Sequence, residues 1–342
     1  MIPVSSSSVQ LPTQKTSADT PWQQLFSESL LTPEQLVQRL ALPETLLTEI
    51  KQANELFQLR VPEPYLDRIK KGDINDPLLK QVLPLGLEAV QTPGYVTDPL
   101  QEKDSNPIPG LVHKYKSRVL LITAGACAIN CRYCFRRHFE YQGNAISSER
   151  LEQISSYLMQ HPEINEVILS GGDPLATSDY RLQKIVSKLE STPHIKRLRI
   201  HTRLPVVIPQ RVTEQLVSLL KGSRLKTVWV LHINHPQEID DQVTRVSRNL
   251  KDNGMLVLNQ SVILRGINDN MTILAALSEA LSEADILPYY LHTFDPVTGA
   301  AHFNVSDQEA IKLWQALQAE LPGFLLPKLV REIPGKPSKT LL

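Results

Sequence analysis

The feature that most restricts the fold of this chain is a repeated alternation of apolar runs and amphipathic stretches. Six apolar runs rich in β-branched residues recur at roughly 30-residue intervals, the length of one strand plus one helix. The stretches between them carry apolar residues at helical spacing, as Leu182, Ile185, Val186 and Leu189 do. The six runs are 118–123, 166–169, 197–201, 227–232, 255–262 and 287–293. Strands that alternate with helices predict an α/β fold built on a parallel sheet.

Polar residues gather where the predicted strands end. They include Gly171, Gly172 and Asp173, the run 201–203, His232, Asn259 with Gln260, and His292 with Asp295. In a barrel of parallel strands every carboxyl end faces one mouth, and chemistry collects there. We therefore predict an incomplete (β/α)6 barrel in preference to an open, doubly wound sheet.

The chain divides into four expected regions. Residues 1–20 are polar and serine-rich and lack the features of a secretory signal, so we expect a loosely held N-terminal tail. Residues 21–110 predict a helical region that prolines break into short pieces, and no motif there indicates chemistry. We expect the barrel over 111–325 and a C-terminal tail over 326–342.

Composition excludes several classes of partner. The 36 Lys and Arg residues balance 36 Asp and Glu residues, which removes the electrostatic argument for binding nucleic acid or an anionic membrane. No apolar run approaches the roughly 20 residues that a membrane-spanning helix needs. Without an export signal we expect a cytoplasmic location, where thiols stay reduced.

All three cysteines of the chain lie within eight residues, directly after the first predicted strand. Cys127, Cys131 and Cys134 have the spacing C-x3-C-x2-C. Three thiolates on one loop suit a soft metal centre, and a cubane iron–sulfur cluster held by three cysteines leaves one iron open to another ligand. The alternative is a structural zinc site, which His138 would complete as the fourth ligand.

The cysteine spacing, with Tyr133 beside the last cysteine, resembles the signature of radical S-adenosylmethionine (SAM) enzymes. This resemblance implies that the cysteines hold a [4Fe–4S] cluster whose fourth iron binds SAM. The family's usual fold is the partial barrel predicted above. The turn Gly171, Gly172, Asp173 matches the element that receives the methionyl amine, and the resemblance places His232 and Gln260 near the adenosyl moiety.

Longer segments resemble the lysine 2,3-aminomutase family within this group. They are 113–118, 131–139, 169–175, 232–236, 258–262, 289–295 and 331–340. The resemblance implies an isomerase that moves the amino group of free L-lysine from C2 to C3. It also implies pyridoxal phosphate as a second cofactor and an electron donor such as flavodoxin or ferredoxin.

The resemblance assigns the cofactor lysine to Lys339. Lysines this close to a chain end are usually solvated, so the sequence by itself would not select Lys339, and Lys336 is the alternative. Lys114 and Arg118 match groups that lie near the cofactor phosphate. The family often has Arg at position 114, and Lys replaces a forked donor by a point charge.

Substrate contacts follow from the same match. Arg136 corresponds to the group that binds the lysine carboxylate, and a planar guanidinium suits that task. Asp295 and Glu332 correspond to acids that bind the distal ammonium, although the family has Asp at position 332. A glutamate aminomutase is the closest alternative, but it would need a cation where these two acids lie.

The segment 134–139 and the short chain are most similar to the branch that serves β-lysylation of elongation factor P. This similarity implies that (S)-lysine becomes (R)-β-lysine and that a lysyl-transfer enzyme attaches the product to elongation factor P. A zinc-bearing binding module without catalysis is the alternative from a different class.

Overall fold

The protein contains a single mixed sheet whose strands follow one another in sequence order. The computed structural model describes residues 20–342. It has a nine-stranded sheet ordered β1 to β9. The strands are β1 (Leu111–Tyr115), β2 (Arg118–Ala124), β3 (Glu166–Gly171), β4 (Arg197–Thr202), β5 (Lys226–His232), β6 (Leu256–Val262), β7 (Leu287–His292), β8 (Lys328–Arg331) and β9 (Thr340–Leu341).

Strands β2 to β8 run parallel to their neighbours, whereas β1 and β9 pair antiparallel at the two ends of the sheet. The six predicted strands correspond to β2 to β7, so the α/β fold and the incomplete barrel are confirmed. Strand β8 adds a seventh parallel strand that the apolar pattern did not indicate. It has four residues, too few for an alternation to stand out.

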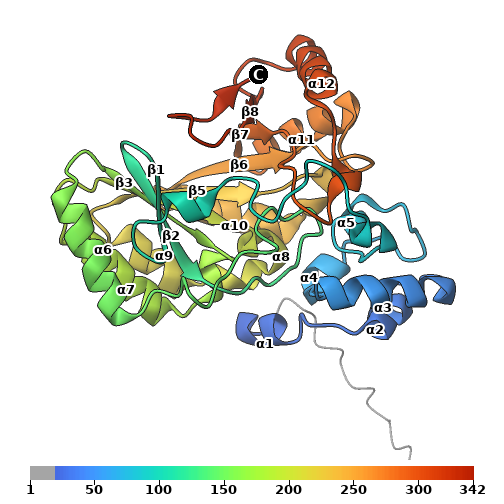
Figure 1. Ribbon diagram of the computed structural model, residues 1–342, viewed down its shortest axis with the longest axis horizontal. Helices are drawn as coiled ribbons and strands as arrows, with labels where there is room; N and C mark the ends of the chain where they lie inside the picture. Colours follow the sequence, from blue (N-terminus) through green and yellow to red (C-terminus); the bar gives the residue numbers. More distant parts are fainter. Residues whose placement is uncertain (1–19) are drawn as a thin grey trace, which may run out of the picture.

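Helices enclose the sheet and form the N-terminal region (Figure 1). The helices are α1 (Trp22–Ser27), α2 (Pro33–Arg39), α3 (Leu47–Leu56), α4 (Glu63–Leu66), α5 (Pro77–Lys80), α6 (Ser148–Gln160), α7 (Asp179–Glu190), α8 (Leu204–Val207), α9 (Glu214–Lys221), α10 (Asp241–Asp252), α11 (Met271–Glu283) and α12 (Asp307–Glu320). Side chains cap many of the longer ones, and Ser306 with Glu309 forms the predicted capping box of α12.

Strand β4 faces the apolar core on one side and the central pocket on the other. Its burial alternates, with Leu198 and Ile200 almost wholly buried in the main core. Arg199 and His201, between and after them, line the central pocket instead. Because successive side chains of a strand point to opposite faces, one face of β4 packs apolar residues while the other lines the pocket.

The N-terminal helices share the core of the barrel. Leu36 and Tyr65 belong to the same apolar cluster as Leu169 and Trp229 of the sheet, and all four are fully buried. The region 21–110 is therefore packed as part of the same body. Among residues 20–342, no helix combines the length and apolar character needed to cross a bilayer.

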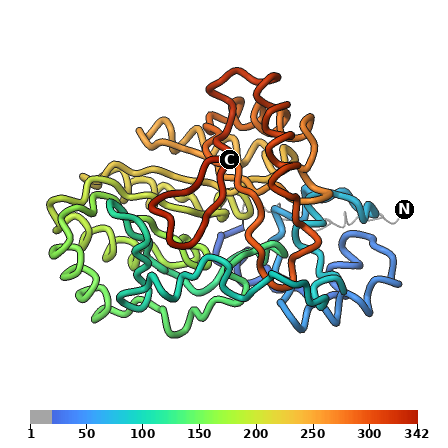
Figure 2. The backbone as a smooth tube through the Cα atoms, turned by 45° about the horizontal axis from the view of Figure 1, so that its top comes forward, coloured from blue at the N-terminus to red at the C-terminus, as the bar shows by residue number. Residues whose placement is uncertain are grey.

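The C-terminal segment returns to the sheet. Val330 and Arg331 of β8 pair with Leu341 and Thr340 of β9. Figure 2 shows this segment, in red, folding back across the middle of the molecule. The N-terminal tail expected at 1–20 lies, except for Thr20, outside the described residues.

Candidate active site

The strands and loops enclose one large cavity of about 660 Å³. Every site residue predicted from the sequence lines it, although these residues come from segments as far apart as Lys114 and Lys339. They are Lys114, Arg118, Cys127, Cys131, Cys134, Arg136, Gly171, Gly172, Asp173, His232, Gln260, Asp295, Glu332 and Lys339.

Two glycines at the end of β3 let the cysteine loop approach the sheet. The amide of Gly172 donates to the carbonyl of Ala124 (2.9 Å). Gly171 has a φ of +122°, a conformation that residues with a Cβ rarely adopt. A Cβ at Gly172 would lie 2.5 Å from the carbonyl oxygen of Ala126. The residue just before Cys127 is thus fixed against a strand end without a side chain.

The carboxylate of Asp173 holds the next strand end. Its Oδ1 accepts from the Thr202 hydroxyl (2.7 Å) and the Leu175 amide (3.0 Å). Its Oδ2 accepts from the amides of Arg203 (2.7 Å) and Leu204 (3.0 Å). With four protein donors, this buried carboxylate fixes the loop after β4, and the cofactor contact that the resemblance implies for this turn stays a prediction.

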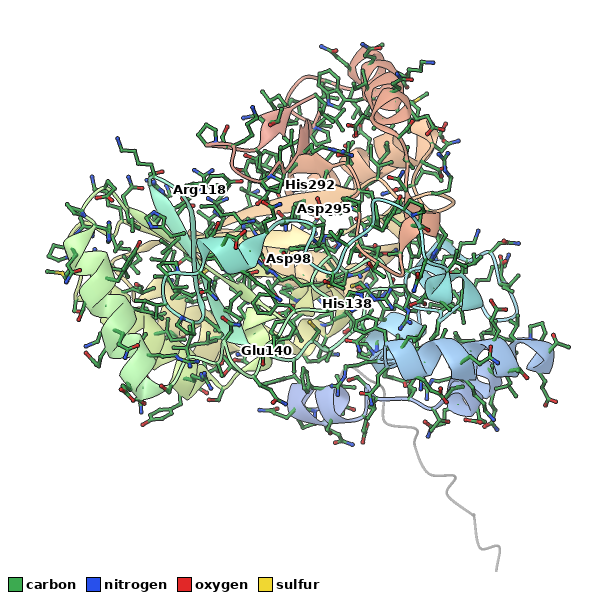
Figure 3. The ribbon with its side chains drawn as sticks, in the orientation of Figure 1. Asp98, Arg118, His138, Glu140, His292 and Asp295 are labelled. Atoms are coloured by element: carbon green, nitrogen blue, oxygen red, sulfur yellow. The ribbon has the colours of Figure 1, made fainter. Side chains whose placement is uncertain are left out.

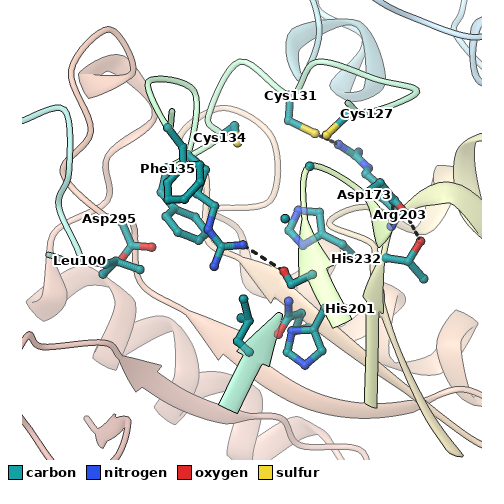
Figure 4. A pocket seen from close by; sticks show the side chains of 18 of the residues that line it. Leu100, Cys127, Cys131, Cys134, Phe135, Asp173, His201, Arg203, His232 and Asp295 are labelled. Atoms are coloured by element: carbon teal, nitrogen blue, oxygen red, sulfur yellow. Dashed lines mark hydrogen bonds between the residues drawn. The ribbon is translucent and has the colours of Figure 1, made fainter. Parts of the chain in front are cut away.

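The three thiols open onto the same part of the cavity (Figure 4). Burial, with the neighbouring Cys134, raises the pKa of Cys127 well above its ordinary value. Burial and Cys131 raise the pKa of Cys134 to about 11. Within residues 20–342, no three Cys, His, Asp or Glu side chains are gathered closely enough to hold a metal ion. The donor chemistry nevertheless fits a cationic cluster, which would offset this resistance of the thiols to ionisation.

His138 does not join the thiols. It is exposed, and its Nε2 lies 3.1 Å from the carbonyl oxygen of Thr298. It does not line the cavity on which the cysteines open. The described structure therefore lacks the fourth ligand on which the alternative of a structural zinc site depended.

A buried arginine that the sequence analysis did not single out anchors the cysteine loop. One Nη of Arg203 donates to the sulfur of Cys131 (2.6 Å) and to the hydroxyl of Tyr133 (2.8 Å), as the dashed line to Cys131 in Figure 4 marks. The other donates to Glu238 (2.8 Å) and to Gln81 (2.7 Å). Arg203 thus connects the N-terminal region, the cysteine loop and the segment after β5.

His232 and Gln260 lie side by side at the ends of β5 and β6. The Nε2 of His232 is 2.8 Å from the hydroxyl of Tyr133. Burial and the charge of Arg203 lower the pKa of His232 to about 3, so its ring is neutral at neutral pH. A neutral imidazole and an amide provide uncharged polar groups close to the cysteines.

Lys339 lies inside the cavity, where its ammonium forms an ion pair with Glu332. The second oxygen of Glu332 accepts from Lys114 (3.1 Å), which also donates to the carbonyl of Leu100 (3.0 Å). Lys336, the alternative cofactor lysine, is exposed on the turn before β9. The fold therefore presents Lys339, and not Lys336, to the cavity.

The two predicted acids carry different charges near neutral pH. Burial and the neighbouring Glu332 raise the pKa of Asp295 to about 7. Burial opposes ionisation of Glu332 too, but Lys339 and Lys114 outweigh it and lower the pKa of Glu332 to about 2. Two facing carboxylates with separated pKa values are typical of functional sites.

Two histidines that were expected at the strand ends, His201 and His292, also face Lys339. Burial, followed by neighbouring cations that include Lys339, lowers the pKa of His201 well below its ordinary value. Burial and Lys339 do the same for His292. Figure 4 shows His201 in the cavity, and Figure 3 shows His292 close to Asp295. Both rings are neutral hydrogen-bonding groups beside the amine.

Two guanidinium groups line the end of the cavity beside Tyr290, whose ring also faces Lys339. Arg118 stacks over the ring of Tyr115 at 4.3 Å. Arg199, which sequence reasoning missed, forms an ion pair with Glu166 and lines the cavity with Arg118. The polar positions of β4 were the signal for Arg199, because alternate residues of a strand share a face. This end of the cavity suits an anion.

Comparison with known proteins agrees with the class that this geometry defines. The pattern of the Radical SAM superfamily matches residues 121–276, which contain the cysteine loop and strands β3 to β6. The chain is 48% identical over 320 residues to the L-lysine 2,3-aminomutase of Haemophilus influenzae, covering 94% of this chain and 95% of that protein.

Two further relatives have the same name. The protein from Escherichia coli is 47% identical over 331 residues, covering 96% of both chains. The protein from Clostridium subterminale is 35% identical over 321 residues, covering 93% of this chain and 77% of that protein. The chain belongs to the L-lysine 2,3-aminomutase family of radical SAM enzymes.

Replacing Gly172 with alanine tests the joint between β3 and the cysteine loop. The added Cβ would meet the backbone of Ala126, so we expect Gly172→Ala to lower the free energy of unfolding by about 1–3 kcal/mol. The matched control is Gly323→Ala, because a Cβ there meets nothing within 4 Å. Urea unfolding measures the stability of both variants, and equal unfolding midpoints would contradict a steric clash at Gly172.

The raised pKa of Asp295 predicts a pH-dependent stability. The folded protein keeps a proton that the unfolded chain releases above its ordinary pKa of 3.8. The free energy of unfolding of the wild type, minus that of Asp295→Asn, should therefore fall as pH rises from about 4 to about 7 and then level off. Urea unfolding at several pH values checks this, and a difference that rises over this range would refute it.

Proposed function

We propose that the protein is a radical SAM aminomutase that moves the amino group of free (S)-lysine from C2 to C3. One observation carries the proposal. The same cavity contains a trio of thiols at one part and a lysine amine with two acids at another. The thiols, to which we assign the generation of a radical, and Lys339 with its two acids, to which we assign the binding of the amino acid, thus open onto one continuous cavity.

We assign two cofactors and SAM to this cavity. Cys127, Cys131 and Cys134 would hold a [4Fe–4S] cluster, and His232 with Gln260 would contact SAM. Lys339 would hold pyridoxal phosphate, whose phosphate we place near Arg118, as the resemblance implies, and near Arg199; Lys114, the other residue that the resemblance implies, is paired with Glu332. When bound, these groups supply hydrogen abstraction from C3 and the temporary attachment of the migrating nitrogen. An electron carrier such as flavodoxin or ferredoxin would supply the reducing electron.

Charge supports lysine as the substrate in preference to glutamate. Asp295 and Glu332 lie on the side of the cavity that contains Lys339, and Glu332 already pairs with the ammonium groups of two lysines. A substrate ammonium can take the place of one of them. The side-chain carboxylate of glutamate would instead add negative charge beside Asp295 and Glu332. The charge of Glu332 already contributes to the raised pKa of Asp295.

The protonation of Asp295 gives this arrangement a way to accept the substrate. At neutral pH the side chain is about half protonated, since its pKa is about 7. A bound ammonium favours the ionised form, so Asp295 would release its proton as the substrate enters. Arg136, at the cysteine side of the cavity, would hold the carboxylate and orient C3 toward SAM.

We further propose that the product is (R)-β-lysine and that it supplies the lysyl-transfer enzyme that modifies elongation factor P. The resemblance of 134–139 to that branch of the family supports this placement. The test is anaerobic incubation of the reconstituted protein with (S)-lysine, SAM and a reductant, followed by chiral mass-spectrometric analysis. We expect (R)-β-lysine from lysine and no product from glutamate; β-glutamate as the main product would overturn the proposal.

Replacing Lys339 should separate the two cofactor sites. Lys339→Ala removes the amine that we assign to pyridoxal phosphate, so the visible absorption of bound pyridoxal phosphate should be lost while iron content stays at the wild-type level. The matched control is Lys336→Ala, because Lys336 is exposed on the same turn. Absorption spectra and iron analysis measure both, and loss of the pyridoxal band in the control alone would transfer the role to Lys336.

A further inference from the structure

An acid from the N-terminal region reaches the cavity beside Arg136. Glu102 begins a short 3-10 turn, Glu102–Ser105, and only 5% of it is exposed. The carboxylate of Asp98, which Figure 3 labels, accepts from the amide of Glu102 (3.1 Å) and fixes the start of this turn. No sequence motif marked Glu102, and it lines the cavity through contacts distant in sequence.

Glu102 binds Arg136 through both of its oxygens. The Nε of Arg136 donates to Oε2 (2.7 Å), and Nη2 donates to Oε1 (2.8 Å). Nη1 donates to the hydroxyl of Ser170 at the end of β3 (2.9 Å). Three of the five N–H groups of a guanidinium are thereby used. One N–H on each terminal nitrogen remains. A carboxylate can accept one hydrogen bond on each of its two oxygens, so these two N–H groups can bind one carboxylate.

We propose that Glu102 is a positioning residue that, with Ser170, fixes the guanidinium of Arg136 so that its two remaining N–H groups receive the carboxylate of the amino-acid substrate. This inference rests on the proposed function. It adds a residue from outside the barrel that acts through Arg136 and does not itself touch the substrate.

The need for such a residue follows from the size of the cavity. An arginine side chain that no neighbour held in a cavity of about 660 Å³ would have many rotamers, and fixing one of them on binding would cost side-chain entropy. A fork to Glu102 fixes the orientation before the substrate arrives, which is the general advantage of preorganisation.

The charge on Glu102 also continues a row of alternating charges. Its Oε1 lies 3.9 Å from the ammonium of Lys114, which binds Glu332, which in turn binds Lys339. The row extends from the group that we assign to the substrate carboxylate to the groups that we assign to its ammonium. Removing the negative charge of Glu102 would therefore affect the carboxylate end first, because Arg136 is its direct partner.

The test compares Glu102→Gln and Glu102→Asp in the reconstituted holoenzyme. We expect Glu102→Gln to raise the KM for lysine about tenfold with a change in kcat of less than about threefold, since it weakens a charged hydrogen-bonding fork. The Asp variant keeps the charge and should recover part of the loss. 1,5-Diaminopentane, which lacks the carboxylate, serves as a competitive inhibitor, and its inhibition constant should not change.

Each outcome discriminates. An unchanged KM, a lower KM, or an equal rise in the inhibition constant of 1,5-diaminopentane would overturn the positioning role. A lower KM would show instead that Glu102 competes with the substrate carboxylate.

Arg136→Gln provides the separate test of the proposed function: an unchanged KM in that variant would show that Arg136 does not bind the substrate carboxylate. If Arg136→Gln raises the KM and Glu102→Gln does not, only the further inference fails. If Glu102→Gln does not fold, Glu102→Asp and Ser170→Ala give the same comparison.

Discussion

The site depends on the hydrogen bonds that the buried guanidinium of Arg203 makes to Cys131, Gln81 and Glu238. Only 6% of Arg203 is exposed, and its partners come from segments distant in sequence. An unpaired charge at this depth would be strongly unfavourable, so Glu238 and Gln81 must lie where they do for the fold to tolerate it. In return, the position of Cys131 is fixed by the protein itself. The N-terminal region, which by sequence looked like a scaffold, is a working part of this arrangement.

A second constraint is that the sheet ends in two edges that do not pair with each other in the described structure. Near one of these edges, Lys114 on β1 forms an ion pair inside the cavity with Glu332, which follows β8. The same pair belongs to the row of charges that includes Glu102 and Lys339. The side chains that connect β1 to the segment after β8 are thus the ones to which we assign the recognition of a charged amino acid.

The local patterns of the sequence were sufficient for most of the fold. Strands β2 to β7 and the position of the cysteine loop were predictable because period, turn and spacing are properties of neighbouring residues. Strands β8 and β9 were not, because they have only four and two residues and form by pairing with segments distant in sequence or with each other.

The site divides in the same way. Cys127, Cys131 and Cys134 could be identified from spacing, and Gly171 and Gly172 from their place at a strand end. Glu102 could not, and Arg203 was marked only as part of a polar run at a strand end, because each acquires its partners through contacts of 34 to 122 positions along the chain. The resemblance selected Lys339 over Lys336, but local sequence could not show that Lys339 lines the cavity while Lys336 lies on an exposed turn, because this depends on how the chain returns to the sheet through β8 and β9.

The open side of the barrel has a consequence for how such a cavity diversifies. Where backbone hydrogen bonds close a barrel, its circumference is set by strand number and register. Here one part of the wall consists of the side chains of Lys114 and Glu332. Exchanging a long residue for a short one at this position changes the width of the cavity without rebuilding any strand. The space beside Lys339 thus depends on individual side chains as well as on the strands.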